Sequence, residues 1–190
     1  IDPDGSIITN IGLDHVDWLG DNREKIGYEK AGIMRHNIPT VYGELDPPNS
    51  IKDTAFDKGA DLVVMGEDYF YENSLDRLWS WQGRFNRRDN LELSKIKGSH
   101  HFRNISAALA LLENINSKEL PSEKMINKAI QAIHLEGRLD QRSIHGRNWL
   151  FDVAHNHDSA RILGDFLSEQ KYRRCIFIFG IMSDKDIHKV

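Results

Sequence analysis

Short β-branched runs alternate with helix-like segments along this chain, and this alternation limits the possible fold more than any other feature. The strand-like runs are rich in Ile, Val and aromatic residues and are bounded by turn residues. They are Ile7–Ile11, Thr40–Tyr42, Leu62–Met65, Trp149–Val153 and Cys175–Phe179. Strands that alternate with helices are typical of α/β layers built on a largely parallel sheet, which is the fold class that we expect.

The segments between these runs carry helix signals. Asp21–Lys30 begins with Asp and Asn, Ser50–Lys58 follows a Pro-Pro break, and Ser122–Ile133 has a capping-box pattern. The expected helices are Asp21–Lys30, Ser50–Lys58, His101–Glu113, Ser122–Ile133 and His157–Gln170. Each of them has a length that is ordinary for a globular protein.

Two stretches interrupt the alternation. In Trp79–Lys97, paired aromatic residues alternate with polar ones, which predicts a β-hairpin or meander inserted between α/β units. A polar, Arg-rich stretch bracketed by glycines follows the fourth expected helix and is the best candidate for a domain boundary. We therefore expect a first domain of residues 1–136, a linker of residues 137–147 and a second domain of residues 148–190.

The composition is that of an ordinary globular protein and gives no sign of a binder of nucleic acid or lipid. The 190 residues are 39% hydrophobic and 28% charged, as in an ordinary globular protein. The net charge is −4, so electrostatics does not favour binding to DNA, RNA or anionic lipid. One cysteine, Cys175, rules out an internal disulfide and fits a reducing compartment. No apolar run approaches the roughly 20 residues that span a bilayer. The first residues also lack the pattern of a secretory leader. We expect a cytoplasmic protein with neither a nucleic-acid nor a membrane partner.

A cluster of ionisable residues follows the first strand-like run. Asp14, His15 and Asp17 lie where ligands bind in open α/β sheets, and a neutral imidazole with carboxylates can hold a divalent metal. Equally, Asp14 could cap a helix while His15 packs beside it. Lys30 closes the next helix, and these residues alone favour a solvated charge that complements the helix dipole.

The stretch Ile8–Ile33 resembles the metal-site region of the folylpolyglutamate and dihydrofolate synthases, members of the Mur-ligase superfamily. It contains the motifs LDHxDWLG and EKAGI at the family's spacing. The resemblance implies that His15 coordinates Mg²⁺ and that Lys30 is carbamylated and provides a second ligand. An ammonium group cannot ligate Mg²⁺, whereas the oxygens of a carbamate can.

Two further segments resemble nucleotide-binding motifs of the same family. Gly98–Ala110 is similar to G-x-H-Q-x-x-N-x-x-x-A, with His101 in place of Gln, and implies that Asn104 contacts the adenine of ATP. Glu136–Asp140 is similar to P-G-R-x-[EQ], with Glu in place of Pro, and implies that Arg138 reaches the ATP phosphates. Without the resemblance, Arg138 would be interpreted as an exposed linker charge.

The segment Phe151–Asn156 matches the family signature L-D-x-A-H-N. The match implies that Asp152 contacts the nucleotide and that His155 lies near the incoming glutamate. Asn156 either touches the ligand or caps the following helix, and the sequence favours neither. Phe179–Asp186 resembles G-[MA]-x-x-D-K-D. The resemblance leaves open whether Asp184 and Lys185 shape the domain interface or the glutamate pocket, or whether Asp184 caps a helix.

Together these motifs imply part of a P-loop-type Mur ligase ATPase domain followed by the start of a Rossmann-like C-terminal domain. The implied activity is ATP-dependent joining of L-glutamate to a folate, either dihydropteroate or a tetrahydrofolate polyglutamate, through an acyl phosphate. This reaction belongs to folate biosynthesis and one-carbon metabolism. ATP and Mg²⁺ are the implied cofactors, Lys30 and His155 the implied catalytic residues, and a monomer the implied state.

The 190 residues contain no G-x-x-G-K-[ST] loop. The resemblance places that loop, and another metal ligand, before Ile1, and it places the rest of the C-terminal domain after Val190. We therefore expect residues 1–190 alone not to turn over. Three alternatives stay open: a UDP-muramyl peptide ligase, a nucleotide-binding remnant without catalysis, and a Mg²⁺ phosphohydrolase. The last leaves the Asp152–Asn156 signature unexplained.

Overall fold

The computed structural model describes residues 2–12, 21–73, 78–92, 100–115, 119–170 and 172–182. These residues fall into two compact units, the first ending at residue 132 and the second beginning at residue 133. Within the described ranges, every helix is too short or too polar to cross a lipid bilayer.

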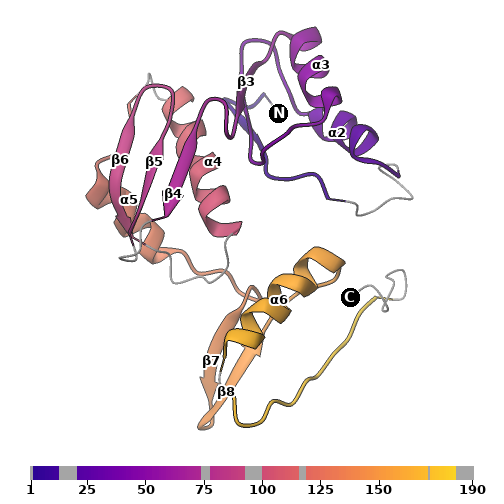
Figure 1. Ribbon diagram of the computed structural model, residues 1–190, viewed down its shortest axis with the longest axis vertical. Coiled ribbons are helices and arrows are strands. Elements are labelled where there is room, and N and C mark those ends of the chain that lie inside the picture. The colour runs from indigo at the N-terminus through magenta and orange to yellow at the C-terminus, as the bar shows by residue number, and fades with distance from the viewer. Residues whose placement is uncertain are drawn as a thin grey trace. The chain divides into compact units, whose positions relative to one another are not determined.

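A parallel sheet of three strands organises the first half of the first unit. Its strands are β1 (Ser6–Ile8), β2 (Pro39–Tyr42) and β3 (Asp61–Val64), in that spatial order. Helix α2 (Arg23–Ala31) leads from β1 to β2, and α3 (Asn49–Lys58) leads from β2 to β3. The two helices pack side by side (Figure 1). This is the α/β arrangement that the sequence predicts.

The sheet is buried on both faces because successive side chains of a strand point to opposite sides. Tyr42 and Val64 join the core beneath α2 and α3, together with Ile26 and Ile51 of those helices. Val41 and Val63 point to the opposite face and join a second core. Helix α4 (His100–Ile115) contacts β1 and β2 and covers this second face.

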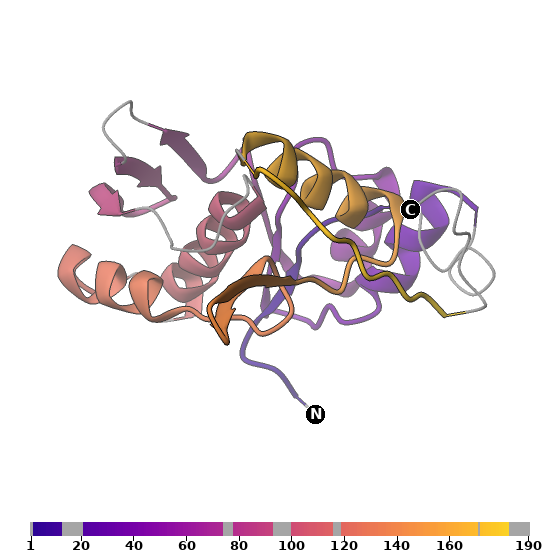
Figure 2. The ribbon, with the colours of Figure 1, turned by 90° about the horizontal axis from the view of Figure 1, so that it is seen from below.

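An antiparallel meander completes the first unit. It consists of β4 (Phe70–Asn73), β5 (Leu78–Gln82) and β6 (Arg87–Glu92). Figure 2 and Figure 1 show α4 and α5 (Glu123–Ala132) against the same face of this meander. The predicted hairpin or meander in Trp79–Lys97 is thereby confirmed for its described residues.

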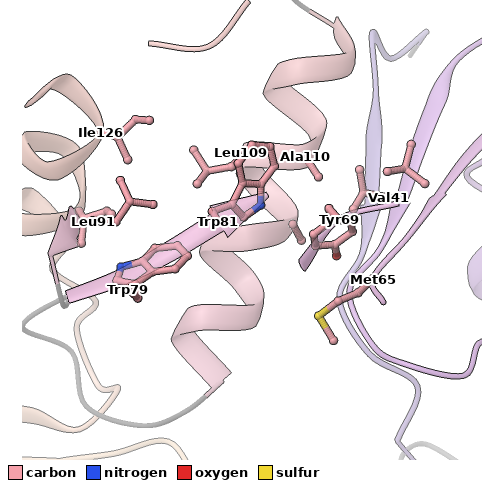
Figure 3. Close-up of a cluster of buried hydrophobic side chains, with 12 residues drawn as sticks. Val41, Met65, Tyr69, Trp79, Trp81, Leu91, Leu109, Ala110 and Ile126 are labelled. Atoms are coloured by element: carbon pink, nitrogen blue, oxygen red, sulfur yellow. The ribbon is translucent and has the colours of Figure 1, made fainter. Parts of the chain in front are cut away.

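Two tryptophans fill the space between the meander and its helices. Trp81 is fully buried against Leu109 and Ala110 of α4 (Figure 3). Its indole nitrogen donates to the Ser106 carbonyl oxygen at 3.2 Å, so burial leaves that polar group satisfied. Trp79 lies edge-to-face with Phe102, at 5.6 Å between ring centroids.

A buried carboxylate joins α4 to the turn between β5 and β6. The Glu113 side chain is only 1% exposed. Its Oε2 accepts from the Arg84 N–H at 3.0 Å, and its Oε1 accepts from the Phe85 N–H at 3.1 Å. The backbone and side-chain amides of Asn86 also donate to Oε1, at 2.6 and 2.9 Å. A buried charge is tolerated only when it is hydrogen-bonded in this way.

The second unit contains a hairpin and one helix. Strands β7 (Asp140–Ile144) and β8 (Arg147–Phe151) pair antiparallel, and α6 (His157–Glu169) follows. The two strands are joined through His145 and Gly146, both with positive φ. Most of residues 137–147, which the sequence indicates as a linker, therefore lies in a paired hairpin of the second unit.

Two local predictions are wrong. Residues Cys175–Phe179 form no strand, and Ile178 is 82% exposed. Their composition favours a strand, but a strand also needs a neighbour for its backbone groups, and none of the described strands pairs with them. At the start of α5, Ser122 accepts weakly from the Met125 N–H at 3.4 Å. The third helical position is Met125, which has no oxygen to complete a capping box.

The remaining helix predictions are confirmed, with ends shifted by one or two residues. Asn22 caps α2 by accepting from the Lys25 N–H at 3.0 Å, as the polar start of that segment indicates. Gly59 ends α3 with φ of +63°, the left-handed conformation that suits glycine. Strand β1 is shorter than predicted, so Thr9 and Asn10 already belong to the loop that follows it.

We expect Glu113→Ala to lower the free energy of unfolding by about 3 kcal/mol or more, because four buried or half-buried N–H donors lose a charged acceptor. Glu113→Gln retains one acceptor oxygen, so its free energy of unfolding should lie between those of Glu113→Ala and wild type. Urea unfolding of the full chain measures both. Asp53→Ala, at an exposed position of α3, is the control and should change stability little. Equal stability of Glu113→Ala and wild type would contradict this role.

A second prediction concerns the stability of the fold at low pH. The nearly buried Asp140 carboxylate accepts from Arg142 Nη2 at 2.6 Å and from Nε at 2.9 Å, and these bonds lower the pKa of Asp140. A carboxyl pKa that is lowered on folding adds stability above the unfolded value of about 3.9, and this stability is lost as the pH falls through the folded pKa.

Unfolding midpoints in urea between about pH 5 and pH 2.5 should therefore fall less steeply for Asp140→Asn than for wild type. Asp140→Asn should also be less stable than wild type at neutral pH. Asp165→Asn, at an exposed position of α6, is the control and should keep the wild-type slope. Parallel slopes for wild type and Asp140→Asn would show that the pair does not act in this way.

Candidate functional site

The carboxyl ends of β1 and β2 bring two loops together at one edge of the parallel sheet. We call residues 9–12 and 43–46 the rim. The Gly43 N–H donates to the Ile8 carbonyl oxygen at 2.8 Å, and a Cβ on Gly43 would lie 2.6 Å from the Thr9 carbonyl oxygen. Only glycine permits this approach of the two loops. Ligands of open α/β sheets bind at such edges.

Lys30 lies at the rim. It occupies the last turn of α2 and is partly exposed, and its Nζ donates to the Asn10 carbonyl oxygen at 2.8 Å. The helix places the lysine near the rim, and the backbone of the loop after β1 holds its amine there. The amine therefore lies at the edge of the sheet.

Glu44 connects three elements at the rim. Its Oε2 accepts from the Ile11 N–H at 3.2 Å and from the Tyr42 hydroxyl at 3.3 Å. Its Oε1 lies 3.4 Å from Arg103 Nη1 on α4. Burial and the charge of Glu44 together raise the pKa of Tyr42 to about 12, so this hydroxyl keeps its proton and continues to donate.

Asn104 follows Arg103 on α4, and its side chain is exposed. A continuous series of contacts joins this part of α4 to Lys30. Arg103 contacts Glu44, and Glu44 contacts Ile11. Lys30 binds the carbonyl oxygen of Asn10, the residue before Ile11. The candidate adenine-binding residue and the candidate metal-binding lysine thus belong to one connected region of the first unit.

The structure describes only part of the predicted metal site. His15, Asp14 and Asp17 lie outside the described residues. Elsewhere in the described chain, no group of three or more His, Cys, Asp or Glu side chains could hold a metal ion. Lys30 fits its expected role in position, since its partly exposed amine is held at the edge of the sheet. Its free amine would have to become a carbamate before it could ligate a hard cation.

In the second unit, Arg138 stands in a turn that Asp152 holds. Arg138 is exposed and lies between Gly137, with φ of +67°, and Leu139, with φ of +47°. Asp152 Oδ2 accepts from the Leu139 N–H at 2.8 Å, and Oδ1 accepts from the Ala154 N–H at 2.8 Å. Asp152, the candidate nucleotide contact, thus holds the turn that carries Arg138, the candidate phosphate contact.

His155 and Asn156 lie at the start of α6. His155 Nδ1 is 2.9 Å from the Val153 carbonyl oxygen. Asn156 caps the helix, since its Oδ1 accepts from the Ser159 N–H at 3.0 Å and the Ser159 hydroxyl closes a capping box. Of the two functions that the sequence left open for Asn156, capping is the one observed. The Asp and Lys of the G-[MA]-x-x-D-K-D segment lie outside the described residues.

Sequence reasoning missed Glu44 and Arg103. Glu44 comes directly after Gly43 at the end of a predicted parallel strand, and that position could have identified it. Arg103 sits beside Asn104 in the same motif, but its partner lies 59 residues away in the chain. Only the tertiary structure reveals this pair.

Comparison with known proteins identifies relatives that match almost the whole chain. The chain is 37% identical over 188 residues to the dihydrofolate synthase/folylpolyglutamate synthase of Escherichia coli K12, and the match covers 98% of the chain and 43% of the relative. A Haemophilus influenzae protein of the same name is 30% identical and matches all of the chain and 46% of its own length. The chain therefore spans less than half the length of these relatives. It matches no family model.

Solved structures agree with this assignment. E. coli FolC in complex with DHPP and ADP superimposes with a TM-score of 0.77 at 35% identity, covering 92% of this chain and 40% of that one. A bifunctional folylpolyglutamate synthase/dihydrofolate synthase with Mn, AMPPNP and L-glutamate bound gives a TM-score of 0.75 at 37% identity, covering 89% and 39%. The chain is therefore a homologue of the dihydrofolate synthase/folylpolyglutamate synthases and has the α/β fold of these Mur-type ligases.

Proposed function

We propose that this chain is part of an ATP-dependent ligase that joins L-glutamate to a folate. The observation that carries the proposal is the position of Lys30. In a chain 37% identical to a dihydrofolate synthase/folylpolyglutamate synthase, the lysine of the EKAGI motif holds its amine at the edge of the parallel sheet, 2.8 Å from the Asn10 carbonyl oxygen. This is where a ligand group for a phosphate-bound cation is needed.

The two units correspond in this proposal to parts of two domains. The first unit represents the later part of a central ATP-binding domain, and the second represents the start of a glutamate ligase domain. The proposed domains, residues 1–136 and 148–190, divide close to the boundary between the units at residue 133.

The proposed reaction has two steps. A carboxylate oxygen of the folate takes the terminal phosphoryl group of ATP, which gives ADP and an acyl phosphate. The amino group of glutamate then attacks the carbonyl carbon, so that a C–N bond forms, the C–O bond to phosphate breaks, and the nitrogen loses a proton. Most of the catalysis in such a transfer is positioning and charge stabilisation.

The residues of the first unit supply binding and positioning. A Mg²⁺ held by His15 and a carbamylated Lys30 would neutralise charge on the transferred phosphoryl group. Asn104 offers the amide donor and acceptor that an adenine edge requires, and its exposure on α4 permits that contact. The Glu44 carboxylate holds Arg103 and the loop after β1 through its contacts with Arg103 and with the Ile11 N–H.

The residues of the second unit act on phosphate and on glutamate. The exposed Arg138 guanidinium provides a fork that matches two phosphate oxygens. His155 Nδ1 must carry the hydrogen in its contact with Val153, because a carbonyl oxygen can only accept. In this tautomer Nε2 is the ring nitrogen that can take a proton from the attacking amine.

We further propose that the protein acts as a cytoplasmic monomer on small molecules, without a nucleic-acid or membrane partner. The support for this is its net charge of −4 and its single cysteine, together with the small-molecule ligands of its structural relatives. The acceptor is dihydropteroate, a tetrahydrofolate polyglutamate, or both.

A coupled phosphate-release assay on the full-length protein tests the activity. ATP, Mg²⁺ and glutamate are supplied with dihydropteroate or with tetrahydrofolate in separate reactions. Glutamate-dependent phosphate release with either acceptor is the expected result, and the pair of reactions identifies which acceptor is used. Release only with a UDP-muramyl peptide would assign the protein to the cell-wall branch. No release with any acceptor would leave a nucleotide-binding protein without ligase activity.

Substitution of Lys30 tests the lysine directly. Lys30→Arg keeps a positive charge but cannot become a carbamate, so kcat should fall by about 100-fold or more if the carbamate serves a catalytic cation. Lys25→Arg is the matched control, because Lys25 lies on the same helix and its exposed amine pairs with Asp21. Its kcat should stay near that of wild type. Full activity in Lys30→Arg would exclude the carbamate.

A further inference from the structure

We propose that Lys58 is a positioning residue for the ligase reaction, because it holds the end of the helix that carries Lys30. This inference rests on the proposed function and deepens it, since it concerns the same lysine. Lys58 lies in the last turn of α3 and is half-buried. Its Nζ donates to the Ala31 carbonyl oxygen at 3.2 Å and to the Gly32 carbonyl oxygen at 3.1 Å. These two residues directly follow Lys30 in the chain.

The C-terminal end of α2 needs this support. The last carbonyl groups of a helix have no partner within the helix, and a glycine in the left-handed conformation often turns later N–H groups back onto them. Gly59 ends α3 in that conformation, whereas Gly32, at the end of α2, has φ of −53°. The Gly32 carbonyl oxygen accepts from two side chains, Lys58 and Arg35, the latter at 3.0 Å. Both positive charges also suit the negative end of the helix dipole.

A second contact joins the same two helices at their other ends. Glu24 lies in the first turn of α2, and its carboxylate accepts from the first N–H groups of α3, those of Asn49 at 3.1 Å and Ser50 at 2.8 Å. Pro48, the residue before α3, has no side-chain oxygen that could cap this helix. The hydrogen bonds, above all the one from Ser50, lower the pKa of Glu24, so its carboxylate stays charged at neutral pH. Each helix thus caps one end of the other.

Between these two contacts, α2 approaches α3 closely at Gly27 (Figure 1). Gly27 is buried, and a Cβ on it would lie 2.6 Å from Ser50 Oγ. Glu24, Gly27 and Ala31 are spaced by three and four residues, so they lie on one face of α2. Lys30 lies about 100° around the helix from Ala31. Contacts at both ends and in the middle fix the rotation of α2, and with it the direction in which Lys30 leaves the helix.

The long side chain of Lys30 makes its nitrogen sensitive to movements of α2. A four-carbon stem separates Nζ from the helix, and Nζ is held 2.8 Å from the Asn10 carbonyl oxygen at the rim. Helix ends fray when their terminal groups lack partners. A shift of about 1 Å in a reacting or ligating group can cost about 100-fold in rate. Loss of the Lys58 contacts therefore acts on catalysis through the position of Lys30.

The alternative is that Lys58 only stabilises the fold, and kinetics of the full-length protein separate the two roles. The kcat and the KM for ATP are measured well below the unfolding midpoint of each variant. Lys58→Met keeps an apolar stem and removes the amine. Lys52→Met is the matched control, because Lys52 lies on the same helix and its exposed amine pairs with Glu67 at 3.0 Å.

We expect Lys58→Met to lower kcat by about 10-fold or more and to leave the KM for ATP near that of wild type. Lys52→Met should keep both values. Lys58→Arg retains the charge and the N–H donors, so it should recover most of the lost kcat. Equal kcat in Lys58→Met and wild type would overturn the proposal, and so would a loss that Lys58→Arg shares in full.

Binding of Mn²⁺ to the full-length protein, followed by electron paramagnetic resonance, gives a readout that requires no turnover. Lys58→Met should bind Mn²⁺ at least about threefold more weakly than wild type and Lys52→Met, because the proposed ligand on Lys30 is displaced. Unchanged Mn²⁺ binding would overturn the proposal. If Lys58→Met does not fold, Lys58→Gln, which keeps one N–H₂ donor, takes its place under the same criteria. Wild-type protein that releases no phosphate with any folate acceptor would instead overturn the proposed function itself.

Discussion

The parallel sheet of the first unit must be buried on both faces, and this requirement determines the position of every element around it. Val41 and Val63 need one apolar layer, and Tyr42 and Val64 need another on the opposite side. A slip of one residue in either strand would exchange the two sets, so the pattern also fixes the register. With the register fixed, the strands end together, and the loops that leave β1 and β2 meet at the rim.

The rim is then shaped by contacts that the sheet makes possible. Gly43 lets the loop after β2 approach Thr9, and this approach brings Glu44 within reach of the Ile11 N–H. The same carboxylate contacts Arg103 of α4, the helix that covers the face of the sheet opposite to α2 and α3. Lys30 completes the group from α2 by binding the Asn10 carbonyl oxygen. A site built in this way depends on backbone positions, and these in turn depend on the two cores beneath.

The predictable part of the fold is the part encoded by neighbours in sequence. Periodicity and capping residues located β2, β3 and the helices, and the family resemblance named Lys30 and Arg138 as candidate site residues. The pairing of Glu44 with Arg103 could not be predicted, because it depends on which helix covers which face. The role of Glu113 was hidden in an Ala- and Leu-rich helix, since its partners lie 27 to 29 residues away. Cys175–Phe179 fails as a strand for the same reason: its residues favour one, but strand formation depends on a partner elsewhere.

The arrangement of charge links these observations to function. The substrates that we propose, ATP, glutamate and a folate, are all anions, yet the chain itself carries a net charge of −4. Several of its carboxylates are bound to the protein's own backbone: Glu113 holds the β5–β6 turn, Asp152 holds the turn at Leu139, and Asp68 accepts from the Val64 N–H at 2.7 Å. Their charge is thereby compensated locally by N–H dipoles. The cationic side chain of Arg138 stays exposed, so an acidic protein can still present positive charge at the phosphate site that we propose.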